Sequence, residues 1–410
     1  MEPRRALVVL FGVLTAFGGF IDIGDLVADA LVGARFGLAL AWVTVLAVVG
    51  IACYAEMAGR VAAAADLPTM AIVRDRLPRA VRVPLVALSV LVTATLVMAE
   101  MAGASLALQI ATGVDYRWFL PGVMVLAVVV STRWRLQTIE SVFGLLGLTI
   151  VVYVAAVFAL HERWAPLAGQ AVPHVPAGGS ALAYAFFAVS LIGVQMTPYE
   201  LYFFSSGAVE HRWGPRRNAL EIRSNVLIGF PLGGAVAIAI QAVAAMVLLP
   251  RGAVPSQLVQ SLDPVTTALG ETGFAVAIFA VFAVTFGATM ETLLSSADTI
   301  AQYLDLPWGT ERPWREARGY HAAIVAIVVA AGAFALSGVD PITVTVYAVI
   351  LNAATLPFIL YAVLRAGNDR ALLGEHANGR LSRWLGTVVL AGVSVAGVLA
   401  IPLLVATQAF

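Results

Sequence analysis

The sequence has no lysine, a single cysteine and few charged residues of any kind. Charged residues fill 12% of the 410 positions, whereas about a quarter is usual in soluble domains. The lone Cys53 excludes an intramolecular disulfide and a cysteine-based metal cluster, and its apolar surroundings suit a small buried hydrophobe. The 24 basic residues, all arginine, balance 24 acidic ones. Net charge therefore gives no reason to expect a nucleic-acid partner.

Apolar residues, in contrast, make up 61% of the chain and gather in long runs. Most of these runs are long enough to cross a hydrocarbon core of about 30 Å as a helix. The first run continues past Gly19 with no cleavage site, so we expect a membrane helix and not a removable signal. We predict an all-α integral membrane protein with about 11 transmembrane helices, at residues 6–34, 38–58, 84–112, 119–131, 139–160, 180–207, 224–249, 272–303, 320–337, 341–364 and 385–406.

The arginines alternate in number from one predicted loop to the next. Of the 24 basic residues, 20 fall on one side when the spans are threaded through a bilayer, and Arg35, Arg117, Arg163 and Arg251 fall on the other. Arginine favours cytoplasmic loops, so we expect a cytoplasmic N-terminus and an extracellular C-terminus in a multi-pass cell membrane protein, most simply in a prokaryotic plasma membrane. Every loop is too short for a soluble core, so residues 1–410 are expected to form a single transmembrane transport domain.

Three acidic residues, Asp22, Asp25 and Asp29, lie inside the first predicted span. An ionisable side chain at this depth is costly and is a functional candidate by default. Neighbouring glycines weaken the helix, and backbone unwound there must line a cavity because lipid cannot satisfy its carbonyls. Asp22 and Asp25 are three positions apart and would share one face even of an intact helix.

The sixth predicted span has a similar interruption. Pro198 removes a helical hydrogen bond, and Gln195, Thr197, Tyr199 and Glu200 surround it. Such a segment is too polar to face lipid. We therefore expect polar side chains from this span to meet those of the first.

Interrupted helices in corresponding places of two halves are typical of transporters built from inverted repeats, with the substrate site at the bilayer midplane. Spans one to five, residues 6–160, would form repeat one, and spans six to ten, residues 180–364, would form repeat two. The helix at 385–406 would be an addition. A single proline kink would be structural more often than functional, but two kinks in matching positions, both beside acids, favour a site.

At these two breaks the sequence resembles the NRAMP family of proton-coupled divalent-metal transporters. Residues 22–25 read Asp-Ile-Gly-Asp where the family carries Asp-Pro-Gly-Asn, and residues 32–37 read Val-Gly-Ala-Arg-Phe-Gly, close to its next motif. Residues 197–202 read Thr-Pro-Tyr-Glu-Leu-Tyr where the family has Met-Pro-His-Asn-Leu-Tyr. The resemblance is diffuse elsewhere, as at residues 99–103 and 356–358. It implies a LeuT-like arrangement of 5+5 inverted repeats, with helices 1 and 6 interrupted.

The departures from the family pattern bear on the substrate. Asp25 and Glu200 replace the family's two amides, and Thr197 replaces its methionine, a soft thioether ligand. Oxygen ligands suit Mg²⁺, Ca²⁺ or Mn²⁺. The chain is thus most similar to a divergent NRAMP-related branch that includes magnesium transporters. The expected metal ligands are Asp22, Asp25, Thr197 and Glu200, and the expected cation is Mg²⁺ or Mn²⁺.

Protons are a second expected partner. Three clustered carboxylates carry up to −3, more than one divalent ion neutralises, so at least one is expected to take a proton. The resemblance implies a proton route at Glu100, although Val97 and Tyr199 stand where the family has an aspartate and a histidine. Asn352 and Glu291 are further candidates near the site, with packing as the alternative for Asn352 and hydrogen bonding between helices as the alternative for Glu291.

The predicted function is secondary active transport of a hard divalent cation by alternating access, in a monomer that needs no cofactor. An alternative is the same fold carrying an organic cation or a Na⁺-coupled solute, and a sensor or channel also stays open. The chain has no nucleophile elbow, zinc-protease motif or nucleotide loop, so we expect no enzymatic activity. Glu140, near the cytoplasm, is expected to pair with Arg133 or Arg135.

Overall fold

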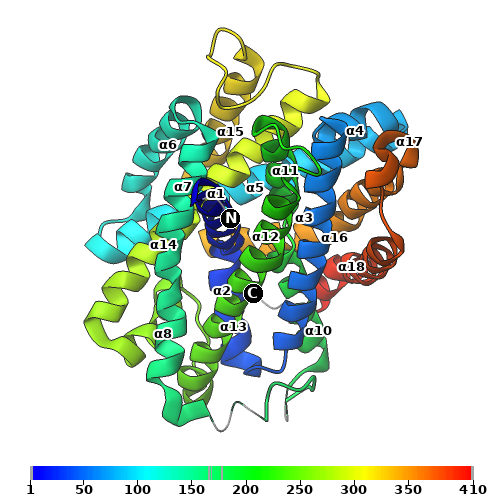
Figure 1. Ribbon diagram of the computed structural model, residues 1–410. Helices are drawn as coiled ribbons and strands as arrows, with labels where there is room; N and C mark the ends of the chain where they lie inside the picture. Colours follow the sequence, from blue (N-terminus) through cyan, green and yellow to red (C-terminus); the bar gives the residue numbers. More distant parts are fainter. Residues whose placement is uncertain (1–2, 165–166, 168, 177–178, 408–410) are drawn as a thin grey trace.

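The computed structural model describes residues 3–164, 167, 169–176 and 179–407. Within these residues every regular element is a helix (Figure 1). The α-helices are α1 (Pro3–Phe20), α2 (Ile23–Phe36), α3 (Ala41–Ala65), α4 (Thr69–Arg76), α5 (Arg79–Thr112), α6 (Tyr116–Arg133), α7 (Leu136–Gly147), α8 (Val152–Ala159), α10 (Ala181–Gln195), α11 (Pro198–Glu210), α12 (Ala219–Ser224), α13 (Phe230–Val247), α14 (Asp263–Tyr303), α15 (Arg318–Leu336), α16 (Pro341–Asn368), α17 (Arg370–Leu373) and α18 (Arg380–Thr407). Short 3-10 or π turns are η1 (Leu148–Val151), η2 (His161–Arg163), η3 (Asn225–Gly229), η4 (Leu249–Arg251), η5 (Leu258–Leu262) and η6 (Gly374–His376).

The predicted all-α membrane fold is confirmed. In the described part of the chain, nine helices are long and apolar enough to cross a membrane, and the bent pair α1–α2 makes ten. The fourth predicted span, 119–131, forms the helix α6, which carries Arg117 near its start and Arg133 at its end and falls outside those ten. The chain thus forms a helix at every predicted span.

Two of the helices extend well beyond the predicted spans. The helix α3 continues past residue 58 to Ala65, and α14 begins at Asp263, nine residues before the predicted start at 272. Gly270 interrupts α14 with a φ of 65°, a conformation that glycine adopts without the steric cost of a Cβ atom. The predicted span starts at 272 because the apolar run begins there, directly after Gly270 and the charged Glu271.

Both predicted interruptions are present. The helix α1 ends at Phe20 and α2 begins at Ile23, with a bend of 61° between them. The helix α10 ends at Gln195 and α11 begins at Pro198, a position where the missing N–H of proline costs no helical hydrogen bond. In Figure 1, α1 and α11 lie in the upper half of the bundle, and α2 and α10 lie in the lower half. The two breaks therefore divide the molecule at the same level.

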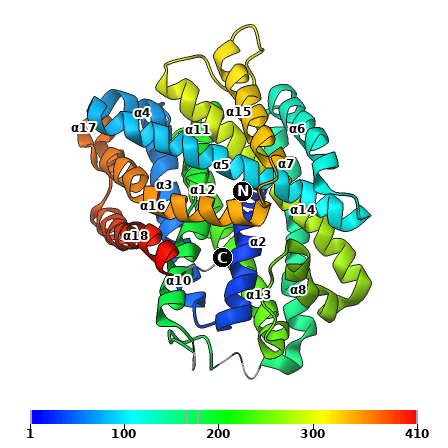
Figure 2. The same ribbon diagram turned by 180° about the vertical axis from the view of Figure 1, so that it is seen from behind.

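Neighbouring helices hold α1 and α2 in place. The helix α1 packs along α7, α2 packs along α13, and α5 packs along α14. Figure 2 shows α5 lying across the middle of the bundle. Gly147 permits the close approach of α7 to α1, because a Cβ atom there would lie 2.7 Å from the Cα of Gly18. Such a contact requires small residues on both helices.

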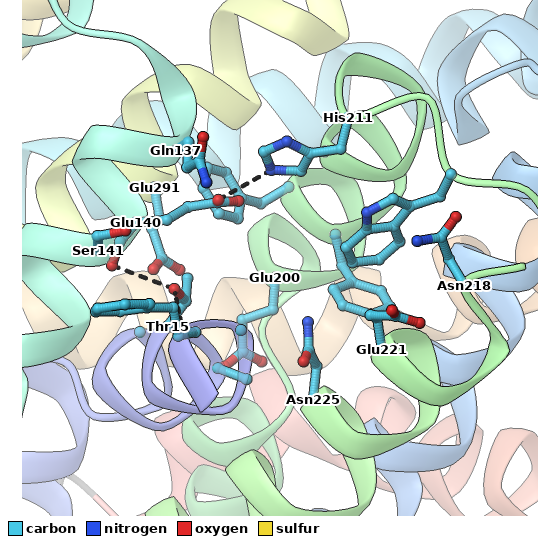
Figure 3. A pocket seen from close by; sticks show the side chains of 18 of the residues that line it. Thr15, Gln137, Glu140, Ser141, Glu200, His211, Asn218, Glu221, Asn225 and Glu291 are labelled. Carbon is cyan, nitrogen blue, oxygen red and sulfur yellow. Dashed lines mark hydrogen bonds and ion pairs between the residues drawn. The ribbon is translucent and has the colours of Figure 1, made fainter. Parts of the chain in front are cut away.

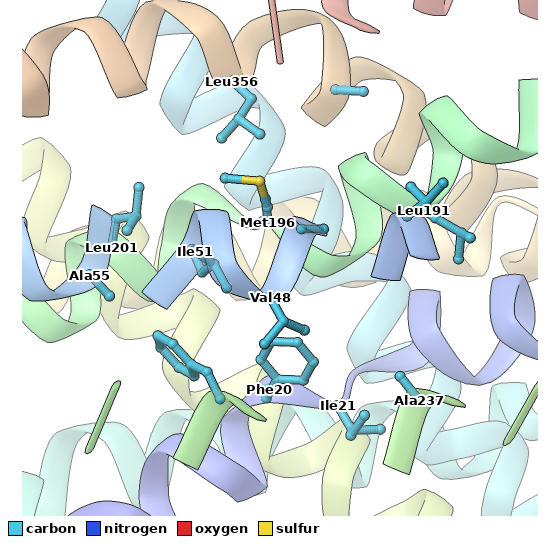
Figure 4. Close-up of a cluster of buried hydrophobic side chains, with 14 of the residues drawn as sticks. Phe20, Ile21, Val48, Ile51, Ala55, Leu191, Met196, Leu201, Ala237 and Leu356 are labelled. Carbon is cyan, nitrogen blue, oxygen red and sulfur yellow. The ribbon is translucent and has the colours of Figure 1, made fainter. Parts of the chain in front are cut away.

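An apolar cluster joins the two breaks on one side (Figure 4). Phe20 and Ile21 from the first break pack with Met196 from the second, together with Val48 of α3 and Leu356 of α16. All five side chains are buried. Because a packed interior leaves little room for displacement, this cluster fixes the two unwound segments relative to each other.

Candidate functional site

Asp22 and Asp25 occupy the first break and hold each other. The backbone N–H of Asp25 donates to Oδ1 of Asp22 at 3.1 Å, and the N–H of Asp22 donates to Oδ2 of Asp25 at 3.0 Å. This is a reciprocal capping box at the start of α2. Both side chains are buried, with exposed fractions of 2% and 0%. The pair stands as two carboxylates at the positive end of a helix, which favours their charge.

Gln195, the last residue of α10, links this pair to a third carboxylate. Its Nε2 donates to Asp25 Oδ1 at 2.7 Å and to Asp29 Oδ2 at 3.3 Å. Gln241 of α13 donates to the other oxygen of Asp29 at 2.7 Å and to the Thr44 hydroxyl at 2.8 Å. Asp29 and Gln241 are absent from the predicted site. The spacing of four residues between Asp25 and Asp29 was the signal for the first of them.

The second break carries buried oxygens without hydrogen-bond partners. Among the described residues, no donor contacts Oγ1 of Thr197, Oε2 of Glu200, Oε1 of Gln195 or Oδ1 of Asn352. Thr197 and Glu200 are 3% and 6% exposed. Buried acceptors without donors are rare and call for an explanation such as a bound ion or water. Four of them near one break are suited to receive a cation.

Glu100 and Tyr199 both reach the first break. The N–H of Ile23 donates to Oε1 and Oε2 of Glu100 at 3.2 and 3.3 Å. The Tyr199 hydroxyl lies 3.3 Å from the Gly19 carbonyl oxygen and 3.4 Å from Asp22 Oδ2, as donor in both contacts. Glu100, the residue expected on a proton route, and Tyr199 thus both touch the unwound segment, Glu100 at its backbone and Tyr199 at its backbone and at a carboxylate.

Asn352 and Glu291 differ in whether their side chains form hydrogen bonds to other helices. The Asn352 amide donates to the carbonyl oxygens of Gly193 and Met196, and so satisfies the broken end of α10. Ser295 of α14 likewise donates across helices, to the Tyr199 carbonyl oxygen at 2.9 Å. Glu291, in contrast, has no hydrogen-bond or ion-pair partner among the described residues. Hydrogen bonding between helices therefore accounts for Asn352 and Ser295 but not for Glu291.

A cavity of about 490 Å³ leads to the breaks from the end of the bundle where α11 ends. It lies between α1, α7, α11, α12 and α14, and its inner wall includes Gly19, Glu200 and Glu291 (Figure 3). On the other side of the first break, a cleft of about 20 Å³ separates α2 from α10 and α16. The two breaks are thus accessible through the large cavity on one side and nearly closed off on the other side.

The expected partner of Glu140 is wrong. Its Oε2 lies 2.9 Å from Nε2 of His211, at the end of α11, and not against Arg133 or Arg135. The Arg135 side chain is 80% exposed and approaches Glu311 at 3.9 Å. Glu140 lies on the face of α7 that lines the cavity. Its side chain therefore contacts α11 on the opposite wall, and not Arg133 or Arg135, which precede α7.

The four predicted metal ligands come from both breaks but do not converge fully. Asp22 and Asp25 are in direct contact, whereas Glu200 lines the cavity. Within the described residues, no three Asp, Glu, His or Cys side chains are placed as a ready metal cluster. The arrangement is a pair of carboxylates with additional oxygens around it, open toward the cavity.

Two broken membrane helices that meet at buried carboxylates, with a cavity open on one side, define a membrane transporter. The profile of the family described as natural resistance-associated macrophage protein-like, or Nramp, matches residues 12–402. The chain belongs to this family. The resemblance seen in the sequence is thereby confirmed.

Similar proteins are divalent metal cation transporters by name. The divalent metal cation transporter MntH of Klebsiella pneumoniae is 25% identical over 398 residues, which cover 95% of this chain and 92% of that protein. MntH of Deinococcus radiodurans is 25% identical over 407 residues, covering 94% and 87% of the two chains.

Solved structures share the fold. A manganese transporter of Eremococcus coleocola superposes with a TM-score of 0.69 at 17% identity, covering 98% of this chain and 88% of that one. The protein MhsT, solved with L-phenylalanine, superposes with a TM-score of 0.67 at 13% identity, covering 96% and 98%. The expected LeuT-like architecture is confirmed by these neighbours.

Proposed function

We propose that this protein is a secondary active transporter that carries a hard divalent cation, Mg²⁺ or Mn²⁺, by alternating access. The expected ligands are Asp22, Asp25, Thr197 and Glu200, and the ion is the substrate and not a resident cofactor. Kinship with proteins named divalent metal cation transporters supports the class of substrate.

The observation that carries the proposal is the chemistry of the two breaks. The first provides two carboxylates, each of which accepts the backbone N–H of the other residue. The second provides a buried oxygen on Thr197 and another on Glu200 that lack partners among the described residues. Buried carboxylates need a positive partner, because an uncompensated charge is costly in a medium of low dielectric constant. The described ion pairs do not include Asp22, Asp25 or Glu200. A cation at the breaks would supply that partner.

The proposed preference for a hard ion rests on the absence of a sulfur ligand from the site. Thr197 stands where the family carries methionine. The adjacent Met196 does not replace it, because its side chain belongs to the apolar cluster of Figure 4, against Gly50. An all-oxygen site suits Mg²⁺ or Mn²⁺ better than softer ions.

Proton coupling is a further part of the proposal. Glu100 contacts the N–H of Ile23, directly beside Asp22. It is close enough to the carboxylate pair to exchange a proton through a side chain or a water. Movement of that proton would change the charge of the site as the ion leaves.

We also propose the orientation and setting in the membrane. The helices α4, with Arg74 and Arg76, and α17, with Arg370, lie at the end of the bundle toward which α11 runs (Figure 1). By the positive-inside rule this end is cytoplasmic. The large cavity would then open to the cytoplasm, with the N-terminus inside and the C-terminus outside. We propose a monomer in the lipid bilayer of a cell membrane, and the bacterial sources of its relatives favour a prokaryotic plasma membrane.

The test is uptake into proteoliposomes with Mg²⁺, Mn²⁺, Ca²⁺, Cd²⁺, Na⁺ and an organic cation offered in turn. We expect saturable uptake of Mg²⁺ or Mn²⁺ that Asp22→Ala abolishes. A parallel record of internal pH measures proton coupling. Uptake of the organic cation alone, or uptake of the divalent ion that Asp22→Ala leaves unchanged, would overturn the proposal.

A further inference from the structure

The cavity that leads to the breaks is acidic along its length. Glu140, Glu200, Glu221 and Glu291 line it, and none of the described residues in its wall is an arginine. In Figure 3 the side chains of Glu140, Glu200 and Glu291 come from three helices toward the same space. A cleft lined by one sign of charge concentrates the opposite ion. This vestibule is therefore suited to hold a cation.

The glutamates differ in what they contact. Glu140 is paired with His211 near the outer end. Glu200 is 6% exposed and its Oε2 has no donor, and Glu291 is 8% exposed with no hydrogen bond or ion pair from the described residues. Leaving a buried carboxylate without a partner costs free energy. Glu291 is thus an acid of the vestibule with no hydrogen bond or ion pair from the described residues, and Glu200 keeps one oxygen without a donor.

Gly19 makes room for Glu291. A Cβ atom at this position would overlap both carboxylate oxygens of Glu291, so the carboxylate lies against the backbone of α1. Gly19 is the second-last residue of that helix. The end of a helix exposes unpaired carbonyls and carries a partial negative charge. A carboxylate beside it is unfavourable unless a cation is shared between them.

Glu200 lies within electrostatic reach of both this carboxylate and the aspartate pair. The charges that act on Glu200 include those of Glu291 and of Asp22. A carboxylate has two oxygens and about four lone-pair directions. Glu200 is therefore able to contact one ion at the breaks and another in the vestibule.

We infer that Glu291 and Glu200, with the carbonyl end of α1 at Gly19, form a second binding site for a divalent cation on the cavity side of the Asp22–Asp25 pair. Mg²⁺ usually keeps several waters and is held by one or two carboxylates. Six waters fill roughly 180 Å³ at about 30 Å³ each, less than the cavity of about 490 Å³. The ion at this site is hydrated, and it receives or releases water as it passes between the breaks and the vestibule.

This inference rests on the proposed function in taking a divalent cation as the substrate, but its test is separate. Equilibrium binding of Mn²⁺ to the purified full chain, followed by electron paramagnetic resonance of the free ion, counts the sites. We expect two sites in the unaltered protein, one in Glu291→Gln and one in Asp22→Ala. Glu271→Gln removes the same charge from an exposed position of the same helix and is expected to keep two sites.

Gly19→Ala provides a second variant that leaves every charge in place. The added methyl displaces the Glu291 carboxylate, so we expect the affinity of the vestibule site to fall by about tenfold or more. The site at the Asp22–Asp25 pair should keep its affinity in this variant. Two sites in Glu291→Gln, a single site in the unaltered protein, or full affinity in Gly19→Ala would overturn the inference. Failure of the proposed function would show differently, as cation uptake that Asp22→Ala leaves unchanged.

Discussion

Asp22 and Asp25 cap each other across the break between α1 and α2, each carboxylate accepting the backbone N–H of the other residue at 3.0 to 3.1 Å. The same two side chains that would bind a cation therefore also end one helix and begin the next. Ligand binding and the shape of the break are coupled at this point. A cation that draws either carboxylate away competes with a backbone hydrogen bond, which links occupancy to conformation.

Asp22→Asn separates these two roles. The amide oxygen still accepts the N–H of Asp25, so the cap survives, but the negative charge is lost. We expect folding to be retained and Mg²⁺ or Mn²⁺ affinity to fall by about tenfold or more, as for loss of a metal-site partner. Calorimetry and proteoliposome uptake measure the effect.

Asp66→Asn is the matched control. Asp66 is exposed and has a φ of 53°, a conformation that asparagine also adopts readily. It should bind and transport the cation like the unaltered protein. Unchanged affinity in Asp22→Asn would mean that Asp22 serves only as a helix cap.

Thr197→Met tests the origin of the preference for a hard ion. The thioether adds a soft ligand at the position where the family carries one, so Mn²⁺ and Cd²⁺ should bind more tightly, by about tenfold or roughly 1.4 kcal/mol. Mg²⁺ should not gain. Calorimetry with the three ions measures the difference.

Thr197→Val is the control for that substitution, because it removes the hydroxyl without adding sulfur. It should weaken Mg²⁺ binding and leave Cd²⁺ without any gain. Equal changes in Cd²⁺ affinity for the methionine and valine variants would place selectivity elsewhere in the site.

Much of the fold and part of the site were predictable from the sequence, for identifiable reasons. Apolar runs and arginine placement identify helices because lipid imposes strong constraints on composition. Asp22, Pro198 and Glu200 stood out because acids and breakers are costly at that depth. Gln241 did not, because an uncharged amide in an apolar helix carries little signal until its partner Asp29 is placed 2.7 Å away.

Contacts between distant helices were not predictable in the same way. The pairing of Glu140 with His211 joins positions 71 residues apart, and only the packed arrangement of α7 and α11 reveals it. The cavity is a further case, since it depends on how five helices meet. Local sequence patterns identify candidate residues, but the folded structure determines which of them lie in contact.

Asn352 is predicted to act through the backbone of the second break. Its amide donates to the carbonyl oxygens of Gly193 and Met196, so Asn352→Ala leaves two buried acceptors without donors. We expect a loss of about 1–3 kcal/mol in the free energy of unfolding, measured as a lower thermal unfolding midpoint.

Asn352→Asp keeps an oxygen in place but loses the donor. It should destabilise the protein as well if the amide serves the backbone. Tighter cation binding with no loss of stability in Asn352→Asp would assign the residue to the metal site instead.

The contact between His211 and Glu140 predicts a pH dependence. Burial opposes the charged imidazole, but the Glu140 carboxylate, with Glu210 and Glu311 nearby, leaves the pKa of His211 raised above its ordinary value of 6.5. A pKa that is higher in the folded state than in the unfolded state stabilises the fold at low pH, and that stability is lost as pH rises through the folded pKa.

The thermal unfolding midpoint should therefore fall as pH rises from below 6.5 through the raised pKa of His211, and His211→Gln should flatten this dependence. His174→Gln removes an exposed histidine and should leave the slope as it is. Identical slopes in the unaltered protein and in His211→Gln would show that other groups cause the pH dependence.

Asp29→Ala tests whether a residue beyond the predicted ligands positions them. Asp29 accepts from both Gln195 and Gln241, and Gln195 also donates to Asp25. Loss of the Asp29 carboxylate frees the Gln195 amide to turn away from Asp25. Removal of groups that orient a metal ligand commonly costs 10–100-fold in affinity, so we expect about a tenfold rise in the cation concentration at half-maximal uptake.

The maximal rate at saturating cation should persist, unlike in Asp22→Ala. Thr44→Val, at the far end of the same network, should change neither quantity. A complete loss of uptake in Asp29→Ala would make Asp29 a direct ligand, and no change would remove it from the site.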